Sequence, residues 1–132
     1  MKNCYCILIL IFFPLFSHSI FAQNLEVIQF ADSLLIDSSK WHQEDDRFCQ
    51  DDKERNQWSL YCVLYEASIQ INGKYKHRGK VMRSIRKAIK QATPKQRFKH
   101  PIRDYNNLQT TKFKDIKEML RQAIELFSAQ NK

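Results

Sequence analysis

Glycine and proline are rare in this chain, and their scarcity limits the folds open to it. The 132 residues contain two glycines and three prolines, and Pro14 lies in an apolar segment near the N-terminus. Sandwiches and barrels need many tight turns, which these two residue types supply. The composition therefore predicts an all-α protein, and we expect a compact bundle of about four helices with two long connecting loops.

Apolar residues recur at helical spacing in four segments. The segments span about 25–36, 59–72, 79–92 and 110–127. Clear stop signals follow two of them, because Gly73 favours a left-handed helix end and Pro94 disfavours helix at the residue before it. Thr110 or Thr111 is expected to cap the last helix.

The second segment differs from the others in the chemistry of its predicted buried face. Tyr61, Cys62, Tyr65 and Ile69 fall on one side of it, so we expect an aromatic face towards the core. The connections at 42–57 and 95–109 are too long to be simple turns, and loops of that length are usually functional or poorly ordered.

The N-terminus has the order of a secretory signal peptide. Lys2 precedes an apolar run at 5–16, and a polar stretch follows. The run is shorter than the roughly 20 apolar residues that span a bilayer, so no transmembrane anchor is expected. We predict cleavage after Ala22, which separates the signal peptide 1–22 from a single exported domain, 23–132, either periplasmic or secreted. An uncleaved signal anchor is the alternative.

Charge is distributed unevenly along the exported domain. Residues 23–66 carry ten acidic and four basic side chains, whereas residues 67–132 carry four acidic and seventeen basic ones. The segment 74–103 is the most basic, with twelve Lys or Arg and no Asp or Glu.

The basic residues of the third predicted helix fall on one side of it, opposite its apolar side. We call this set the basic face; its members are Lys80, Arg83, Arg86, Lys87 and Lys90. Such a face is either an ordinary solvated surface or a site that attracts an acidic protein or an anionic envelope surface. A third alternative is that the acidic stretch 44–52 folds over it. Nucleic acid is a less favoured partner, because export removes the protein from most of it.

The exported domain contains two cysteines, Cys49 and Cys62. An even count in an oxidising compartment favours a disulfide between them. A metal site is not predicted, since zinc requires four ligands and neither cysteine lies at a recognised spacing from a histidine.

Short polar residues surround an aromatic one at 104–107. Such residues commonly bond to nearby backbone groups in turns and caps, which would make this loop structural. The alternative is a polar ligand site formed where four side chains meet at the helix ends. These side chains are Trp41, His100, Asp104 and Asn106.

Three segments resemble a small uncharacterised bacterial family, domain of unknown function 6197. They are Trp41-His42-Gln43, the run from Cys62 to Ala67, and Tyr105-Asn106-Asn107 followed by Thr111 before an amphipathic helix. The likeness extends over nearly all of 25–127, although Tyr65 stands where small residues are common and the basic run is unusually dense. The resemblance implies a compact helical domain and no particular activity.

Two hypotheses for function remain. The first is an exported, non-enzymatic binding module that uses the basic face. The second is a small hydrolase or ligand-handling protein that uses His100, Asp104 and Asn106, with Cys62 as a further candidate. Neither hypothesis requires a cofactor, and none is predicted.

Overall fold

The computed structural model describes residues 20–130, and in that range the protein is helical. No strand occurs in these residues, only an isolated bridge between Trp41 and Trp58. The all-α prediction is therefore confirmed. In chain order the elements are α1 (Ile20–Leu34), the 3-10 helix η1 (Ser38–Lys40), α2 (Cys49–Arg55), α3 (Leu60–Asn72), α4 (Lys80–Ala92), α5 (Pro101–Asn106) and α6 (Phe113–Ala129).

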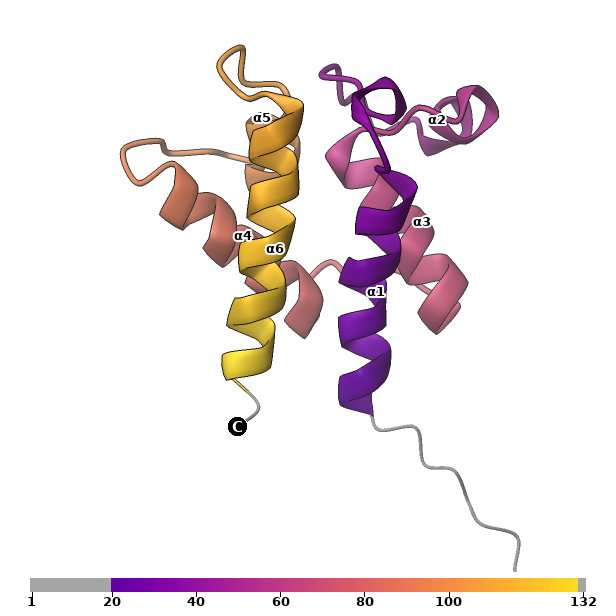
Figure 1. Ribbon diagram of the computed structural model, residues 1–132, viewed down its shortest axis with the longest axis vertical. Helices are drawn as coiled ribbons and strands as arrows, with labels where there is room; N and C mark the ends of the chain where they lie inside the picture. Colours follow the sequence, from indigo (N-terminus) through magenta and orange to yellow (C-terminus); the bar gives the residue numbers. More distant parts are fainter. Residues whose placement is uncertain (1–19, 131–132) are drawn as a thin grey trace, which may run out of the picture.

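The four long helices form a bundle with the two short ones at one end (Figure 1). Helices α1 and α6 lie side by side and run in opposite directions. Helix α3 packs against α1, and α4 packs against α6. Helices α2 and α5 contact α3 and gather where it begins, so this end of the bundle brings together segments far apart in the sequence.

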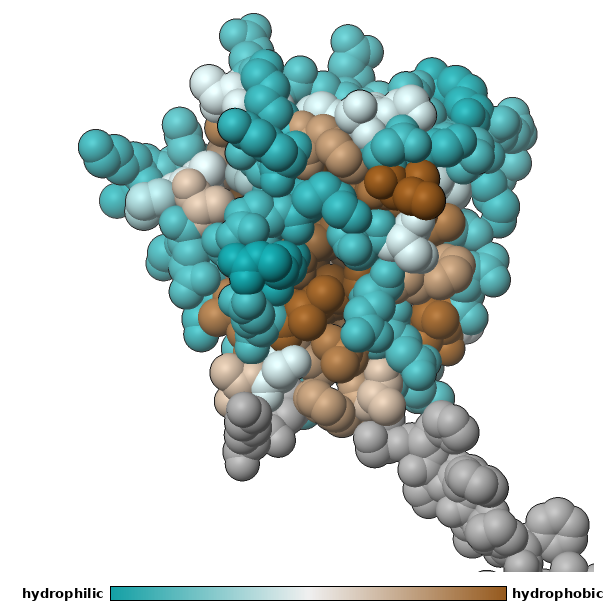
Figure 2. All heavy atoms as spheres, viewed as in Figure 1, coloured by the Kyte–Doolittle hydropathy of each residue, from teal (hydrophilic) through white to brown (hydrophobic). Residues whose placement is uncertain are grey.

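The core is built by one face of each long helix. Fully burying an aliphatic or aromatic side chain contributes about 1.5–3 kcal/mol, so this set supplies most of the driving force for folding. The largest fully buried side chains are Val27, Ile28, Leu35, Leu60, Leu64, Met82, Ile85, Ile89, Ile116, Met119, Leu120 and Phe127. Figure 2 shows hydrophilic side chains over most of the visible face, with apolar atoms in the seam between α1 and α6.

Local sequence explains where the helices begin and end. Gly73 closes α3 in the left-handed region, with φ 68°, and its N–H bonds to the Ile69 carbonyl. Helix α4 ends at Ala92, and Thr93 forms its C-cap just before Pro94. The N-cap of α6 is Lys112 rather than either threonine, because the carboxylate of Asp115 accepts the Lys112 N–H at 2.9 Å.

Two features of the structure differ from the sequence-based expectations. Tyr61 and Tyr65 lie at the edge of the core, only half-buried, and aliphatic residues such as Val63 and Leu64 fill the buried face of α3. The long connections also contain the short helices α2 and α5, which have too few turns to show a clear apolar period.

The predicted signal peptide lies outside the described residues except for its last three positions. Helix α1 begins at Ile20, and Phe21 stacks on Phe127 with ring centroids 5.4 Å apart. Cleavage after Ala22 would therefore shorten α1 and remove this stack. Among the described helices, none is both long and apolar enough to cross a membrane.

Candidate functional site

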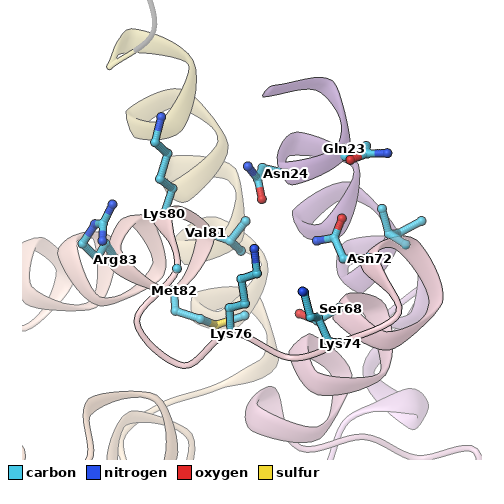
Figure 3. Close-up of a pocket in the computed structure, with 12 residues that line it drawn as sticks. Gln23, Asn24, Ser68, Asn72, Lys74, Lys76, Lys80, Val81, Met82 and Arg83 are labelled. Atoms are coloured by element: carbon cyan, nitrogen blue, oxygen red, sulfur yellow. The ribbon is translucent and has the colours of Figure 1, made fainter. Parts of the chain in front are cut away.

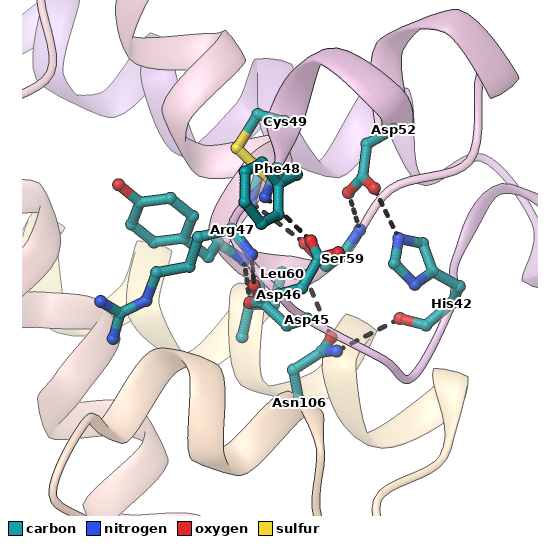
Figure 4. The surroundings of a disulfide bond; sticks show 12 residues. His42, Asp45, Asp46, Arg47, Phe48, Cys49, Asp52, Ser59, Leu60 and Asn106 are labelled. Atoms are coloured by element: carbon teal, nitrogen blue, oxygen red, sulfur yellow. Dashed lines mark hydrogen bonds and ion pairs between the residues drawn. A yellow bond between two sulfur atoms is a disulfide. The ribbon is translucent and has the colours of Figure 1, made fainter.

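The first turn of α3 is capped by side chains from four places in the chain. The first N–H groups of any helix lack partners within it and must be satisfied from outside. Here four consecutive N–H groups each have a side-chain acceptor. The pairs are Ser59 N–H to Asp52 Oδ2 (2.8 Å), Leu60 N–H to Asn106 Oδ1 (3.0 Å), Tyr61 N–H to Asp45 Oδ2 (3.2 Å) and Cys62 N–H to Ser59 Oγ (3.3 Å). We call Asp45, Asp52, Ser59 and Asn106 the capping centre (Figure 4).

Asn106 is the most connected member of the capping centre, and it is fully buried. Besides the Leu60 N–H, its oxygen accepts a bond from Trp41 Nε1 at 2.8 Å. Its amide group donates to the carbonyls of His42 (3.2 Å) and Gln43 (2.9 Å). An asparagine side chain has two donor hydrogens and two acceptor lone pairs, so Asn106 has no capacity left for a ligand.

Asp45 and Asp52 are buried, with 3% and 1% of their surfaces exposed. They lie at the positive end of the α3 dipole, which favours a negative charge there. Asp52 also lies 2.8 Å from His42 Nε2 and pairs with Arg55. Burial raises the pKa of Asp45, although the N–H groups of Tyr61 and Arg47 partly oppose this shift.

A disulfide joins the start of α2 to the first turn of α3, beside the capping centre. Cys49 begins α2, Cys62 lies in the first turn of α3, and their Cα atoms are 5.0 Å apart, within the usual range for a bridge. The predicted pairing is confirmed (Figure 4). Because its sulfur is bonded and fully buried, Cys62 has no free thiol for nucleophilic chemistry.

The four residues of the predicted polar ligand site form two separate pairs. Trp41 bonds to Asn106 inside the capping centre. His100 and Asp104 meet at the start of α5, where the His100 N–H donates to Asp104 Oδ2 at 2.8 Å. Among the described residues no hydrogen bond joins one pair to the other.

Asp104 is also bound by its neighbour Arg103, whose guanidinium makes two bonds to Oδ1 at 2.8 and 3.0 Å. Partial burial acts to raise the pKa of Asp104, but the His100 N–H and the Arg103 guanidinium outweigh it and lower the pKa. This carboxylate is therefore held charged, as a cap for α5 and not as a proton-transfer group.

Four members of the basic face, Lys80, Arg83, Lys87 and Lys90, are exposed on α4. The fifth, Arg86, is half-buried, and its guanidinium donates to the His77 carbonyl at 2.9 Å. In the described part of the chain none of the five makes an ion pair.

The acidic stretch 44–52 does not neutralise the basic face. Its two buried carboxylates serve the capping centre, and Asp46 accepts the N–H of Phe48 two residues on. Ion pairs from this end of the molecule go to His42 and Arg55 nearby. The cations of α4 are therefore left available at the surface.

A hollow of about 530 Å³ lies where α4 begins (Figure 3). Asn24 of α1 and Asn72 of α3 face Lys76 and Val81 across it. Three further cations, Lys74, Lys80 and Arg83, also line it, which extends the basic surface beyond α4.

Residues 20–130 contain no group of three or more His, Cys, Asp or Glu that could hold a metal ion. In comparisons with known proteins, no family model matched the sequence, and no curated protein or solved structure matched it either. The resemblance to domain of unknown function 6197 stays a prediction.

The cysteine pair was predicted from the sequence, whereas the capping centre was not. Of the capping centre, only Ser59 had a local signal, since a serine just before an apolar helix is a common N-cap. Asp52 lies seven residues before Ser59, in the helix before α3. Asp45 and Asn106 act on a helix that is more distant from them in the sequence, and a single sequence contains no signal for such contacts.

Proposed function

We propose that this protein is an exported, non-enzymatic binding module that docks on an acidic protein through the exposed cations of the basic face. The observation that carries the proposal is that these exposed cations have no acidic partner in the described residues. Lys80, Arg83, Lys87 and Lys90 are exposed and make no ion pair within the described residues. The nearby acidic stretch is engaged in capping α3 instead.

The physical basis of docking is long-range attraction followed by short contacts. Exposed charges act over about 8 Å at physiological salt, so a row of cations on one helix raises the rate of encounter with an acidic surface. The hollow at the start of α4 adds Lys74 and Lys76 to the same surface and provides a concave region for a protruding acidic side chain.

The predicted signal peptide and the disulfide support export together. Disulfides persist in oxidising compartments and are rare in the cytosol. A cut after Ala22 and the loss of two hydrogens would both be visible in the intact mass of the protein. An intact mass that still includes residues 1–22 would contradict this part of the proposal, and so would a mass that shows Cys49 and Cys62 as free thiols.

The docking experiment is a titration with a short glutamate-rich peptide, at low and high salt, followed by calorimetry. We expect Arg83→Glu/Lys87→Glu to weaken binding by roughly tenfold or more, because two attractive charges become repulsive. Binding to the unaltered protein should fall as salt rises.

The matched control is Lys112→Glu/Lys114→Glu, which changes the net charge equally at exposed positions of the α6 start. Equal weakening by both double variants would show that net charge alone is responsible and would overturn the proposal. Anionic lipid vesicles form a second arm, and binding to vesicles but not to the peptide would also overturn it.

Within residues 20–130, no structural feature favours the hydrolase alternative. Asn106 has no free hydrogen-bonding capacity, Asp104 is bound by Arg103 and the His100 N–H, and Cys62 is in a disulfide.

A further inference from the structure

A second hollow, of about 240 Å³, lies between α3, α4 and the start of α5. Tyr61, Tyr75 and Pro101 contribute to its walls. No carboxylate lines it. The remaining titratable groups that line it are all basic: Arg47, His77, Arg86, Lys99, His100 and Arg103. We call this hollow the tyrosine pocket.

The cations of the tyrosine pocket come from separate segments and converge. Arg86 of α4 donates to the His77 carbonyl, and its guanidinium lies 3.2 and 3.3 Å from the two ring nitrogens of His77. The guanidinium of Arg47 lies 5.7 Å from the centroid of the Tyr61 ring. Figure 4 shows Arg47 extending away from His42 and Asn106, out of the capping centre.

The positive charge of the tyrosine pocket is largely uncompensated. Two carboxylates are bonded to pocket residues: Asp104 pairs with Arg103, and Asp45 accepts the backbone N–H groups of Arg47 and Tyr61. Within the described residues Arg47, Arg86 and Lys99 make no ion pair. Burial lowers the pKa of His77, and the positive charges of Arg86, Arg78, Arg47 and His100 lower it further.

A further feature of the pocket is costly unless a ligand uses it. The Tyr75 hydroxyl is buried and makes no hydrogen bond within the described residues, and an unsatisfied buried hydroxyl costs about 1–3 kcal/mol. Burial raises the pKa of Tyr75 to about 12, so this hydroxyl remains a donor. Arg47 has a left-handed backbone, with φ 68°, in a local turn where its N–H donates to Asp45 Oδ1 at 3.0 Å.

We propose that the tyrosine pocket binds a phosphate group, either inorganic phosphate or the phosphate of a small monoester. Guanidinium groups match phosphate oxygens with paired hydrogen bonds, and two or more uncompensated cations suit a dianion better than a single carboxylate. The pocket is smaller than the 300–1,000 Å³ typical of sites for drug-sized ligands, which restricts the monoester to a small one. The tyrosine walls favour a ring attached to the phosphate.

This inference is independent of the docking proposal, because the pocket and the basic face share only Arg86. Variants at Arg47 and Lys99 test the pocket, whereas variants at Arg83 and Lys87 test docking. Loss of one kind of binding without the other identifies which proposal has failed.

The test is an NMR titration of the full exported protein with phenyl phosphate and, separately, with inorganic phosphate at constant ionic strength. We expect saturable shifts at the His77 ring, and a rise in the pKa of His77 when the bound dianion offsets the surrounding cations. Tighter binding of phenyl phosphate would identify a ring-bearing monoester as the ligand, and equal binding would identify the phosphate alone.

Arg47→Ala and Lys99→Ala are the informative variants, since neither side chain makes a hydrogen bond to another element in the described residues. We expect each to weaken phosphate binding by roughly tenfold, and the exposed control Arg83→Ala to leave it unchanged. The proposal is overturned if no saturable change occurs, or if Arg83→Ala weakens binding as much as Arg47→Ala does.

Discussion

The acidic stretch 44–52 and the basic segment 74–103 differ in what the fold does with their charges. Asp45 and Asp52 of the first are buried and bonded to the N-terminus of α3. The cations of the second are mostly exposed, and those of the basic face are unpaired in the described residues. The difference teaches that a carboxylate placed where a helix begins is used for folding, whereas a cation on the outer side of a helix stays available for binding.

The largest effect should follow from breaking the capping centre at Asn106. In Asn106→Ala the Leu60 N–H, the Trp41 indole N–H and two carbonyls lose their partner. Each buried polar group left unsatisfied costs about 1–3 kcal/mol, so we expect a loss of roughly 4 kcal/mol in the free energy of unfolding. Urea denaturation measures it. The exposed Gln91→Ala on α4 should change stability by less than about 0.5 kcal/mol, and a similarly small effect at Asn106 would contradict the role of the capping centre.

The disulfide should have the next largest effect. It closes a loop with a sequence separation of 13, and the chain-entropy model gives about 3 kcal/mol for such a loop. Cys49→Ala/Cys62→Ala should therefore unfold at a clearly lower urea concentration. Adding a reducing agent to the unaltered protein should lower the urea concentration of unfolding by most of the same amount. If neither change lowers it, the bridge does not restrain α2.

A smaller effect concerns the two types of carboxylate. The pKa of Asp45 should lie above the ordinary aspartate value of 3.8 because the group is buried, and that of Asp104 below 3.8 because of its hydrogen bonds. Protonating Asp45 then favours the folded state; this contribution is complete below pH 3.8 and is lost as the pH rises through the folded pKa. The contribution of Asp104 is present above pH 3.8 and is lost as the pH falls through its lowered pKa.

Carbon NMR of the carboxyl groups during a pH titration measures both pKa values. Equal values for Asp45 and Asp104 would remove the distinction between a buried capping carboxylate and a partly exposed paired one.

Helix boundaries were predictable where the chain carries strong local signals. Helices α3 and α4 were expected at 59–72 and 79–92 and are observed at Leu60–Asn72 and Lys80–Ala92, because Gly73 and Pro94 end them through backbone constraints that act locally. The start of α1 was less well predicted, at residue 25 instead of Ile20.

The buried face of α3 was misassigned for a physical reason. Apolar residues surround much of this helix, so the periodicity fits either Tyr61 and Tyr65 or Leu60 and Leu64. Burial of the aliphatic set leaves the tyrosine hydroxyls near the surface, where the tyrosine pocket forms.

A candidate site could be predicted from the sequence only where all its residues lie on one helix. The basic face lies on α4 and was visible in the spacing of its charges. The capping centre and the tyrosine pocket each combine residues from several elements, such as Arg47 with Arg86. They depend on the packing of α3 against α2 and α5, and of α4 against α5. Spacing along one sequence cannot reveal such combinations.

The most direct test of this account is the free energy of unfolding of Arg83→Glu/Lys87→Glu, measured by urea denaturation at low salt. We expect a change of less than about 0.5 kcal/mol, because neither cation has an acidic partner in the described residues. A loss of about 2 kcal/mol or more would show that the acidic stretch pairs with α4, and would contradict the claim that the basic face is free to bind.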